Sequence, residues 1–554
     1  MKKRILSILL TVCLLMALLP TVAFAEGSVT YLDADGTLKT SPSATEVTSS
    51  DTEWTGTTTN PGWYVVNTNV TIGTEDNPQR VTVSGDVRLI LADGCTLTVN
   101  GCIQVQDDDD DITNGSANAL TIYAQSTDES TMGELIAKGA ERDFNAAIGG
   151  GNGDTGGSGG SGGKITINGG IVTATSNAGA GIGGGYGDGS GGSGGTVTIN
   201  GGIVTATSIG GAGIGGGWGE SIAGDGGKIT ITGGNIAASG YTGTAIGGGY
   251  GTLGGSGGEV TITGGTVTAT GNARGNTNAY IIGVEGIGGG RYDVTSGTDG
   301  TFQTTNNGNA VIFASSIGDQ SHKADWSGII VVGNKGEVYG SSVTPIEDFT
   351  IENGKTLTIH SGKTLIIPKG VTMTVNGTLT NNGKIYVDGT FTGTADNLYY
   401  PLTITNATGS GDISEYNSKT YGKAGGKITL TPDTPPTGYS FDKWVVLPSS
   451  VTVNANNSFT MPSTPLELTA QWKDIENPVI TGIENDKTYC AEVGFEASDN
   501  DGRPAENNPN TGATVPQTGD NSNMALWMAV LLVSGGLLTV TVIKGVETEQ
   551  KRRK

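Results

Sequence analysis

Histidine, cysteine and aromatic residues are scarce in this chain. It has 554 residues, of which 2 are histidine and 4 are cysteine, and aromatic residues make up 6%. Neither His322 nor His360 lies beside a serine or cysteine nucleophile pattern, and no metal-ligand spacing is present. The sequence therefore favours a protein that is not an enzyme. A pair of carboxylates for glycoside cleavage stays open, because pairing across distant segments is invisible in sequence.

The cysteines are too few to form a disulfide scaffold. Cys13 lies in the apolar N-terminal stretch, which leaves Cys95, Cys102 and Cys490. An odd and sparse set is no disulfide framework. We expect these side chains to be small buried hydrophobes, with a Cys95–Cys102 bridge as the alternative.

Positive charge is also in short supply. The chain has 30 Lys and Arg against 53 Asp and Glu, a formal net charge of −23. Such a surface repels nucleic acid and anionic lipid, so nucleic acid is excluded as a partner. One acidic run is either a solvated loop or a Ca²⁺ site, since calcium prefers several carboxylate oxygens. No cofactor is expected apart from calcium in that second interpretation. The run comprises Asp107, Asp108, Asp109, Asp110 and Asp111.

The N-terminal end has the three parts of a secretory signal peptide. Three basic residues at 2–4 precede an apolar run over 5–19, and Ala23-Phe24-Ala25 follows as a small-x-small cleavage site. We expect residues 1–25 to be removed by cleavage after Ala25. Residues 26–59 then form an N-terminal segment or cap, with Trp54 in it and Trp63 nearby.

The C-terminal end has the parts of a membrane or wall anchor. An apolar stretch over 524–543 is long enough to span a bilayer as a helix, and the basic tail over 544–554 holds it on the cytoplasmic side. The residues before it are Val515, Pro516, Gln517, Thr518 and Gly519.

This pentapeptide resembles the sortase sorting signal, whose usual form is Leu-Pro-x-Thr-Gly. The resemblance implies that a sortase cuts between Thr518 and Gly519 and joins the Thr518 carboxyl to peptidoglycan. Val515 stands where the family has leucine, which leaves the sortase subtype open. We therefore expect sortase and peptidoglycan as partners and a location on the cell wall. A retained single-pass membrane helix is the alternative.

Glycine is the residue in excess, with 96 copies, and it recurs at an interval. The segment KITINGG at 164–170 returns in similar form at 196–202, 228–234 and 259–265, a period of about 32 residues. After each Gly-Gly pair comes a run such as IVTATS, and then a segment such as AGIGGG. Each repeat therefore contains two short strands with alternating apolar residues and a third segment of small residues.

Strands this short cannot be stable alone, but identical coils can be stacked so that each backbone pairs with the next. The sequence predicts an all-β protein with a parallel β-helix over 60–398, whose regular core is 146–292. A flexible glycine-rich linker is the alternative. The coils resemble glycine-rich β-helix segments of gut-bacterial surface proteins and, more loosely, carbohydrate-binding β-helices and pectate-lyase-like folds. That resemblance implies architecture and not activity.

Residues 402–473 have a different composition, with more aromatic residues. GYSFDKW at 438–444, SFTMP at 458–462 and LELTAQW at 466–472 resemble the Listeria–Bacteroides (internalin B-type) repeat. The resemblance implies a small β-grasp-like module used as a stalk or for adhesion. Its core would contain Phe441, Trp444, Phe459 and Trp472. Residues 474–497 resemble the start of a bacterial immunoglobulin-like domain too short to be complete, and 498–514 is a polar flexible linker.

Three aromatic residues follow a Gly-Gly-Gly run at equal spacing, namely Tyr186, Trp218 and Tyr250. In a stacked solenoid they form a column on one face. The column either packs the loops together or contacts glycans, because sugar rings present apolar faces. We expect a non-enzymatic adhesin or glycan-binding surface protein whose ligands are host or dietary glycans. A wall-bound polysaccharide lyase or hydrolase and a structural spacer are the alternatives.

Overall fold

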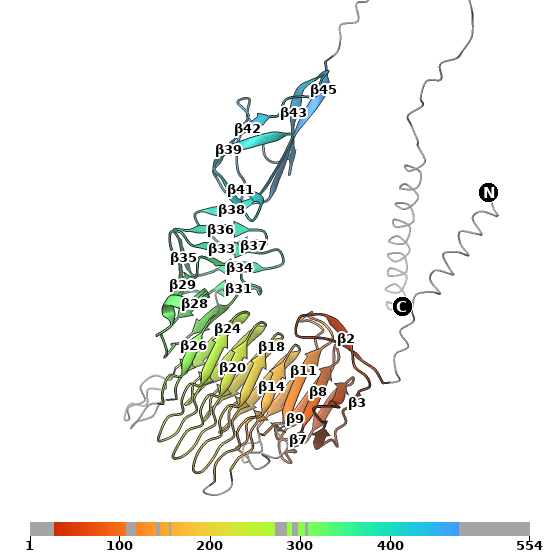
Figure 1. Cartoon of the computed structure of the whole chain (residues 1–554), viewed down its shortest axis with the longest axis vertical. Coiled ribbons are helices and arrows are strands. Elements are labelled where there is room, and N and C mark those ends of the chain that lie inside the picture. Colours follow the sequence, from red (N-terminus) through yellow and green to blue (C-terminus); the bar gives the residue numbers. More distant parts are fainter. Residues whose placement is uncertain are drawn as a thin grey trace, which may run out of the picture. The chain divides into compact units, whose positions relative to one another are not determined.

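The computed structural model describes residues 27–106, 118–139, 144–153, 157–271, 285–290, 297–304 and 308–475. The regular elements among these residues are strands (Figure 1), apart from one short 3-10 turn, η1 (Lys323–Asp325). The predicted all-β parallel β-helix is confirmed. The described residues all lie in one compact unit, residues 1–475. The predicted signal peptide over 1–25, the predicted sorting signal at 515–519 and the apolar stretch at 524–543 lie outside the described residues.

The first stack of coils has three parallel sheets, which form three sides of each coil. Sheet 1 consists of β4 (Glu53–Thr55), β7 (Val81–Ser84), β10 (Ile103–Gln104), β13 (Ile148–Gly149), β16 (Ile182–Gly183), β19 (Ile214–Gly215), β22 (Ile246–Gly247) and β25 (Ile287–Gly288). Sheet 2 consists of β3 (Thr45–Glu46), β5 (Gly62–Val66), β8 (Asp86–Leu91), β11 (Ala119–Ala124), β14 (Lys164–Ile167), β17 (Thr196–Ile199), β20 (Lys228–Ile231), β23 (Glu259–Ile262) and β26 (Thr301–Gln303).

Sheet 3 contains the IVTATS strands and extends beyond the first stack. It consists of β6 (Val70–Ile72), β9 (Thr96–Asn100), β12 (Glu134–Lys138), β15 (Ile171–Ser176), β18 (Ile203–Ser208), β21 (Asn235–Gly240), β24 (Thr266–Gly271), β27 (Val311–Ala314), β28 (Gly328–Val332), β29 (Lys335–Tyr339), β32 (Thr356–Ile359) and β35 (Thr378–Asn381). A hairpin of β1 (Thr30–Leu32) and β2 (Leu38–Thr40) precedes the stack.

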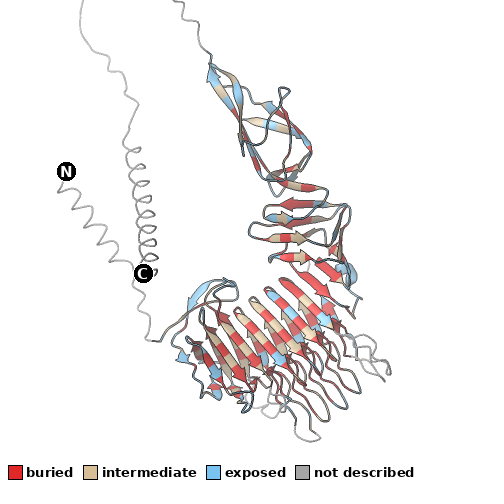
Figure 2. Ribbon diagram, turned by 180° about the vertical axis from the view of Figure 1, so that it is seen from behind, coloured by how far each residue is buried: buried red, intermediate tan, exposed pale blue. Residues whose placement is uncertain are grey.

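Like side chains lie on like side chains inside the first stack. Ile165, Val197, Ile229 and Val260 are register partners along sheet 2, and each is at most 2% exposed. Alternate positions face outwards and are polar, as the burial pattern of the strands in Figure 2 shows. Trp54, 0% exposed, fills the N-terminal end of this core. Trp63 instead stacks with Tyr123 and packs against Tyr31 in a separate cluster.

Each strand of sheet 1 in the repeats is followed by a glycine-rich segment, here called a glycine arm. The arms of neighbouring coils pack against one another. The N–H groups of Gly192, Gly217, Gly224 and Gly249 donate in turn to the carbonyls of Gly185, Gly192, Gly217 and Gly224, each at 2.9 Å. The backbones approach so closely that a Cβ on Gly192 or Gly224 would overlap the carbonyl oxygen of the neighbouring coil. Glycine is therefore required here by packing and not only by turns.

The β-helix is interrupted at an elbow between β27 and β29. β28 lies parallel to β27 but pairs antiparallel with β29, so the strand direction of sheet 3 reverses. Alternate residues of β27 then face two cores: Ile312 and Ala314 belong to the first core, and Val311 and Phe313 to a second. Crossovers between parallel strands keep one hand. After the strand direction has reversed, the crossovers can have the same handedness only if the following coils lie on the opposite side of sheet 3.

The second stack therefore uses the former outer side of sheet 3 as its inner wall. Its other sides are sheet 4, with β30 (Ser342–Val343), β33 (Thr364–Ile367), β36 (Lys384–Val387), β38 (Leu398–Thr405), β41 (Lys419–Lys423) and β40 (Ile413–Tyr416), and sheet 5, with β31 (Phe349–Ile351), β34 (Thr372–Val375) and β37 (Thr390–Thr392). These coils are shorter because they have no glycine arm.

The C-terminal module continues sheet 4. β38 pairs with β36 of the second stack and then with β45 (Leu466–Asp474), which also pairs with β43 (Tyr439–Leu447). A second layer contains β39 (Ala407–Gly411), β42 (Lys427–Pro432) and β44 (Ser458–Thr460). The predicted core position is right for Phe459, at 1% exposed. It is wrong for Phe441 and Trp472, which are half-buried, because β43 and β45 continue beyond the strand that covers them.

We expect Gly224→Ala to lower the free energy of unfolding by about 3 kcal/mol or more, since the backbone of the adjacent coil cannot move away. Gly362→Ala is the control. Gly362 has φ +81°, and a Cβ added there would meet no other atom within 4 Å. It should cost only about 1–2 kcal/mol, the strain of a left-handed residue. Equal losses in urea unfolding would contradict the packing role.

The loop after the first stack should be sensitive to acid. Burial raises the pKa of Asp319, but hydrogen bonds from the Ser321 hydroxyl and backbone and from the Phe302 N–H outweigh it and hold this pKa at about 2. The stability from this ionised carboxylate is present above its unfolded pKa and is lost as pH falls from about 4 to about 2. Asp319→Asn should remove this part of the pH dependence in thermal melts, and the exposed Asp325→Asn should not.

Candidate functional site

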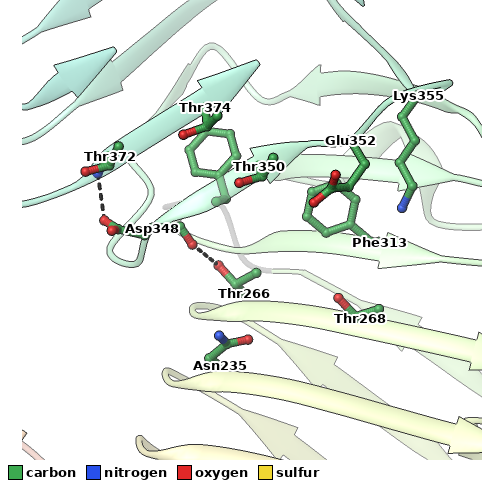
Figure 3. Close-up of a pocket in the computed structure, with 11 residues that line it drawn as sticks. Asn235, Thr266, Thr268, Phe313, Asp348, Thr350, Glu352, Lys355, Thr372 and Thr374 are labelled. Atoms are coloured by element: carbon green, nitrogen blue, oxygen red, sulfur yellow. Dashed lines mark hydrogen bonds between the residues drawn. The ribbon is translucent and has the colours of Figure 1, made fainter. Parts of the chain in front are cut away.

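The elbow encloses a cleft of about 450 Å³, here called the elbow cleft. Figure 3 shows its lining, which comes from both stacks. The lining residues are Asn235, Thr266, Thr268, Phe313, Asp348, Phe349, Thr350, Glu352, Lys355, Thr372 and Thr374.

The floor of the cleft is the outer side of sheet 3. Asn235 and Thr266 are register partners on β21 and β24, and Thr268 pairs with Phe313 of β27. These are alternate positions that face away from the first core, which is why the sequence has polar residues there until β27. The wall comes from outward positions of sheet 5, namely Thr350 on β31 with Thr372 and Thr374 on β34.

Hydrogen bonds join floor and wall. The Thr266 hydroxyl donates to the carbonyl of Asp348 at 3.2 Å, and the Thr372 N–H donates to the Asp348 carboxylate at 2.7 Å. The Lys355 ammonium lies over the Phe313 ring, 4.6 Å from its centroid. The carboxylate of Asp348 is therefore held in place, while Lys355 covers the aromatic surface of the cleft.

This set of groups suits a neutral polar ligand with many hydroxyls. Threonine hydroxyls and the Asn235 amide can both donate and accept, and Asp348 and Glu352 can only accept when ionised. The volume lies in the usual range for small-molecule sites. The approach along sheet 3 is also uncharged, since the strands IVTATS, IVTATS, NIAASG and TVTATG have no charged residue.

A second groove, of about 230 Å³, lies along the coil corner between sheets 2 and 3. Its lining includes Glu347, Glu129 and the N-terminal hairpin. Burial raises the pKa of Glu347, a hydrogen bond from the Gly234 backbone lowers it, and the nearby Glu129 and Asp348 raise it further. A neutral ligand is favoured here as well, because an anion would add to these like charges.

The three predicted column residues form a ladder. Ring centroids are 5.3 Å apart between Tyr186 and Trp218 and 6.0 Å apart between Trp218 and Tyr250, both in edge-to-face geometry, and Phe144 extends the row. Tyr186 is 7% exposed, and Trp218 and Tyr250 are half-buried. Contact of a glycan with these residues stays a prediction.

The Tyr186 hydroxyl is shared between two carboxylates of neighbouring arms. It donates to Asp188 at 2.6 Å and to Glu220 at 3.0 Å. Desolvation and these bonds to Asp188 and Glu220 raise the pKa of Tyr186. The phenol thus stays protonated and holds two acidic loops together, which is a structural role.

The remaining predicted sites have different outcomes. Asp107 to Asp111 lie outside the described residues. Within the described ranges, no group of three or more His, Cys, Asp or Glu residues is placed to hold a metal ion. Cys95 is a free thiol that packs against the first core, so the alternative of a Cys95–Cys102 bridge is wrong. None of the helices in the described parts is long and apolar enough to cross a membrane.

The comparisons with known proteins bear on the C-terminal module. A family model described as a divergent InlB B-repeat domain matches residues 400–476, which confirms the resemblance predicted for 402–473. No curated protein and no solved structure matches the chain. A repeat of this type fits a surface or adhesin-like protein.

Trp218→Ala tests the structural role of the ladder. It removes the ring between Tyr186 and Tyr250, so the free energy of unfolding should fall by about 2 kcal/mol, less than for a fully buried tryptophan. Exposed Tyr439→Ala in the module is the control and should change stability little. A stable Trp218→Ala protein that loses glycan binding would instead support the recognition role.

Proposed function

We propose that the protein is displayed on the cell surface and binds neutral glycans in the elbow cleft without cleaving them. The observation that supports this most is the lining itself. Threonine hydroxyls from two separate stacks face one space of about 450 Å³, together with an amide, two carboxylates, one ammonium group and two aromatic rings. Carbohydrates are recognised by hydrogen bonds to their hydroxyls and by contact of their apolar faces with aromatic rings.

Display on the cell wall is the second part of the proposal. The signal peptide over 1–25 would direct export. A sortase would then join Thr518 to peptidoglycan and release the segment that follows. The divergent InlB B-repeat domain supports a surface location. In this arrangement the module lies between the wall attachment and the elbow cleft in chain order.

The proposal predicts weaker glycan binding when cleft hydroxyls are removed. Thr350→Val with Thr374→Val keeps side-chain shape but deletes two donors. Each lost hydrogen bond costs about 1 kcal/mol, so affinity for a glycan found on an array should fall about tenfold or more. The matched control is Thr198→Val, an outward threonine of sheet 2 that lies outside the cleft.

The same experiment separates the alternatives. Equal binding by the double variant and the wild type would exclude the elbow cleft as the site. If the protein released new reducing ends from a polysaccharide panel, it would be a lyase or hydrolase and not a binding protein. If the protein bound no glycan, the remaining hypothesis would be that it is a structural spacer.

A further inference from the structure

The first and last strands of the C-terminal module pair with each other in parallel. The chain leaves the second stack through β38 and leaves the module through β45. Leu402, Thr403, Ile404 and Thr405 of β38 pair in parallel register with Leu466, Glu467, Leu468 and Thr469 of β45. The two strands that connect the module to the rest of the chain are thus bonded directly to each other.

A parallel pair of this kind is loaded lengthwise. β38 is held at its N-terminal end, where it pairs with β36 of the second stack and with β41. β45 would be pulled at its C-terminal end, Asp474. Because the strands run in the same direction, these opposite pulls slide one strand along the other. Hydrogen bonds in the ladder run across the strands, so all of them resist sliding together.

One face of the same pair is buried, whereas Thr403 and Glu467 on the other face are exposed. Leu402, Leu466, Leu468 and Ala470 are between 0% and 3% exposed and belong to or adjoin the module core. The Asn406 side-chain amide also donates to the Ala470 carbonyl, at 3.3 Å, from the turn that follows β38. The buried face shields the ladder bonds from water on one side, which makes them costlier to break because water cannot replace them from that side.

The attachment of β38 to the second stack is reinforced by a cluster of tyrosines. Tyr386 contacts Tyr416 and Tyr421 at centroid distances of 4.8 and 4.7 Å, and the Tyr421 hydroxyl donates to Asp388 at 3.1 Å. These residues lie on β36, β40, β41 and the turn after β36. The fixed end of the parallel pair is therefore joined to the stack by side chains as well as by backbone bonds.

From this geometry we infer that the β38–β45 pair is a mechanical clamp, which lets the module transmit tension between a bound glycan and the cell wall without unfolding. The direction of loading rests on the proposed wall attachment, and the clamp itself is a property of the fold. The β-helix coils differ, since tension at the end of a coil peels its hydrogen bonds one after another.

The test stretches the full chain between its two ends with optical tweezers. Module unfolding is recognised by its length: β38 to β45 spans 77 residues (474 − 398 + 1), which release roughly 270 Å when extended. One coil of 32 residues, as between Ile182 and Ile214, releases roughly 110 Å. The expected result is that the 110 Å steps come first and the 270 Å step needs a higher force.

A second arm keeps the sequence of the clamp unchanged. The distal handle is moved from the C-terminus to exposed Ser449, after β43. Tension then peels β43 from β45 beginning at the Leu447–Glu467 pair. Because the bonds now break singly, we expect the force of the module step to fall at least about twofold.

Two variants test single bonds of the clamp. Successive residues of β38 direct their N–H groups to opposite sides, so only one of Thr403→Pro and Ile404→Pro removes a bond to β45. The other variant is its matched control. Equal module forces with both handles, or a module step that precedes the coil steps, would overturn the clamp. No glycan is present, so this failure would leave the glycan-binding proposal intact, and lost binding in the cleft variants would leave the clamp intact.

Discussion

The close, in-register stacking of one coil on the next is the constraint on which the rest of this structure depends. Strands of two to six residues have no stability of their own and obtain it only from the coil above and below. Stacking at strand distance allows β-branched side chains to form ladders inside. It also allows the glycine arms to approach until no Cβ fits between them. The high glycine content is thus part of the packed structure.

The fixed hand of parallel crossovers explains the elbow and, through it, the cleft. Once β29 pairs antiparallel with β28, the following coils must lie on the other side of sheet 3. The outer side of that sheet, polar along β21 and β24, therefore becomes the inner wall of the second stack from β27 onwards. The elbow cleft lies where these two uses of one surface meet, which is why the polar residues of β21 and β24 adjoin the aromatic ring of Phe313 there.

The module continues a sheet of the solenoid and is not an independent domain. Open sheet edges invite pairing with other chains, and solenoids need caps. β38 covers the edge of sheet 4 and begins the module with the same strand. A single strand therefore belongs to the stack, to the cap and to the parallel pair with β45. The half-buried Phe441 and Trp472 lie farther along β43 and β45, where the hairpin continues without that cover.

Sequence by itself determined the parts of this protein that repeat or that are local. A period of about 32 residues in Gly-Gly pairs, with alternating Ile and Val, is enough to predict stacked strands, because register follows from pattern. It also located the module at 402–473. Tertiary structure alone decided the elbow and the cleft. VIFA at 311–314 is apolar at every position, so sequence does not say which side faces which core. Thr266 and Thr350 meet across the cleft because strand direction reverses between them, a choice made by long-range pairing.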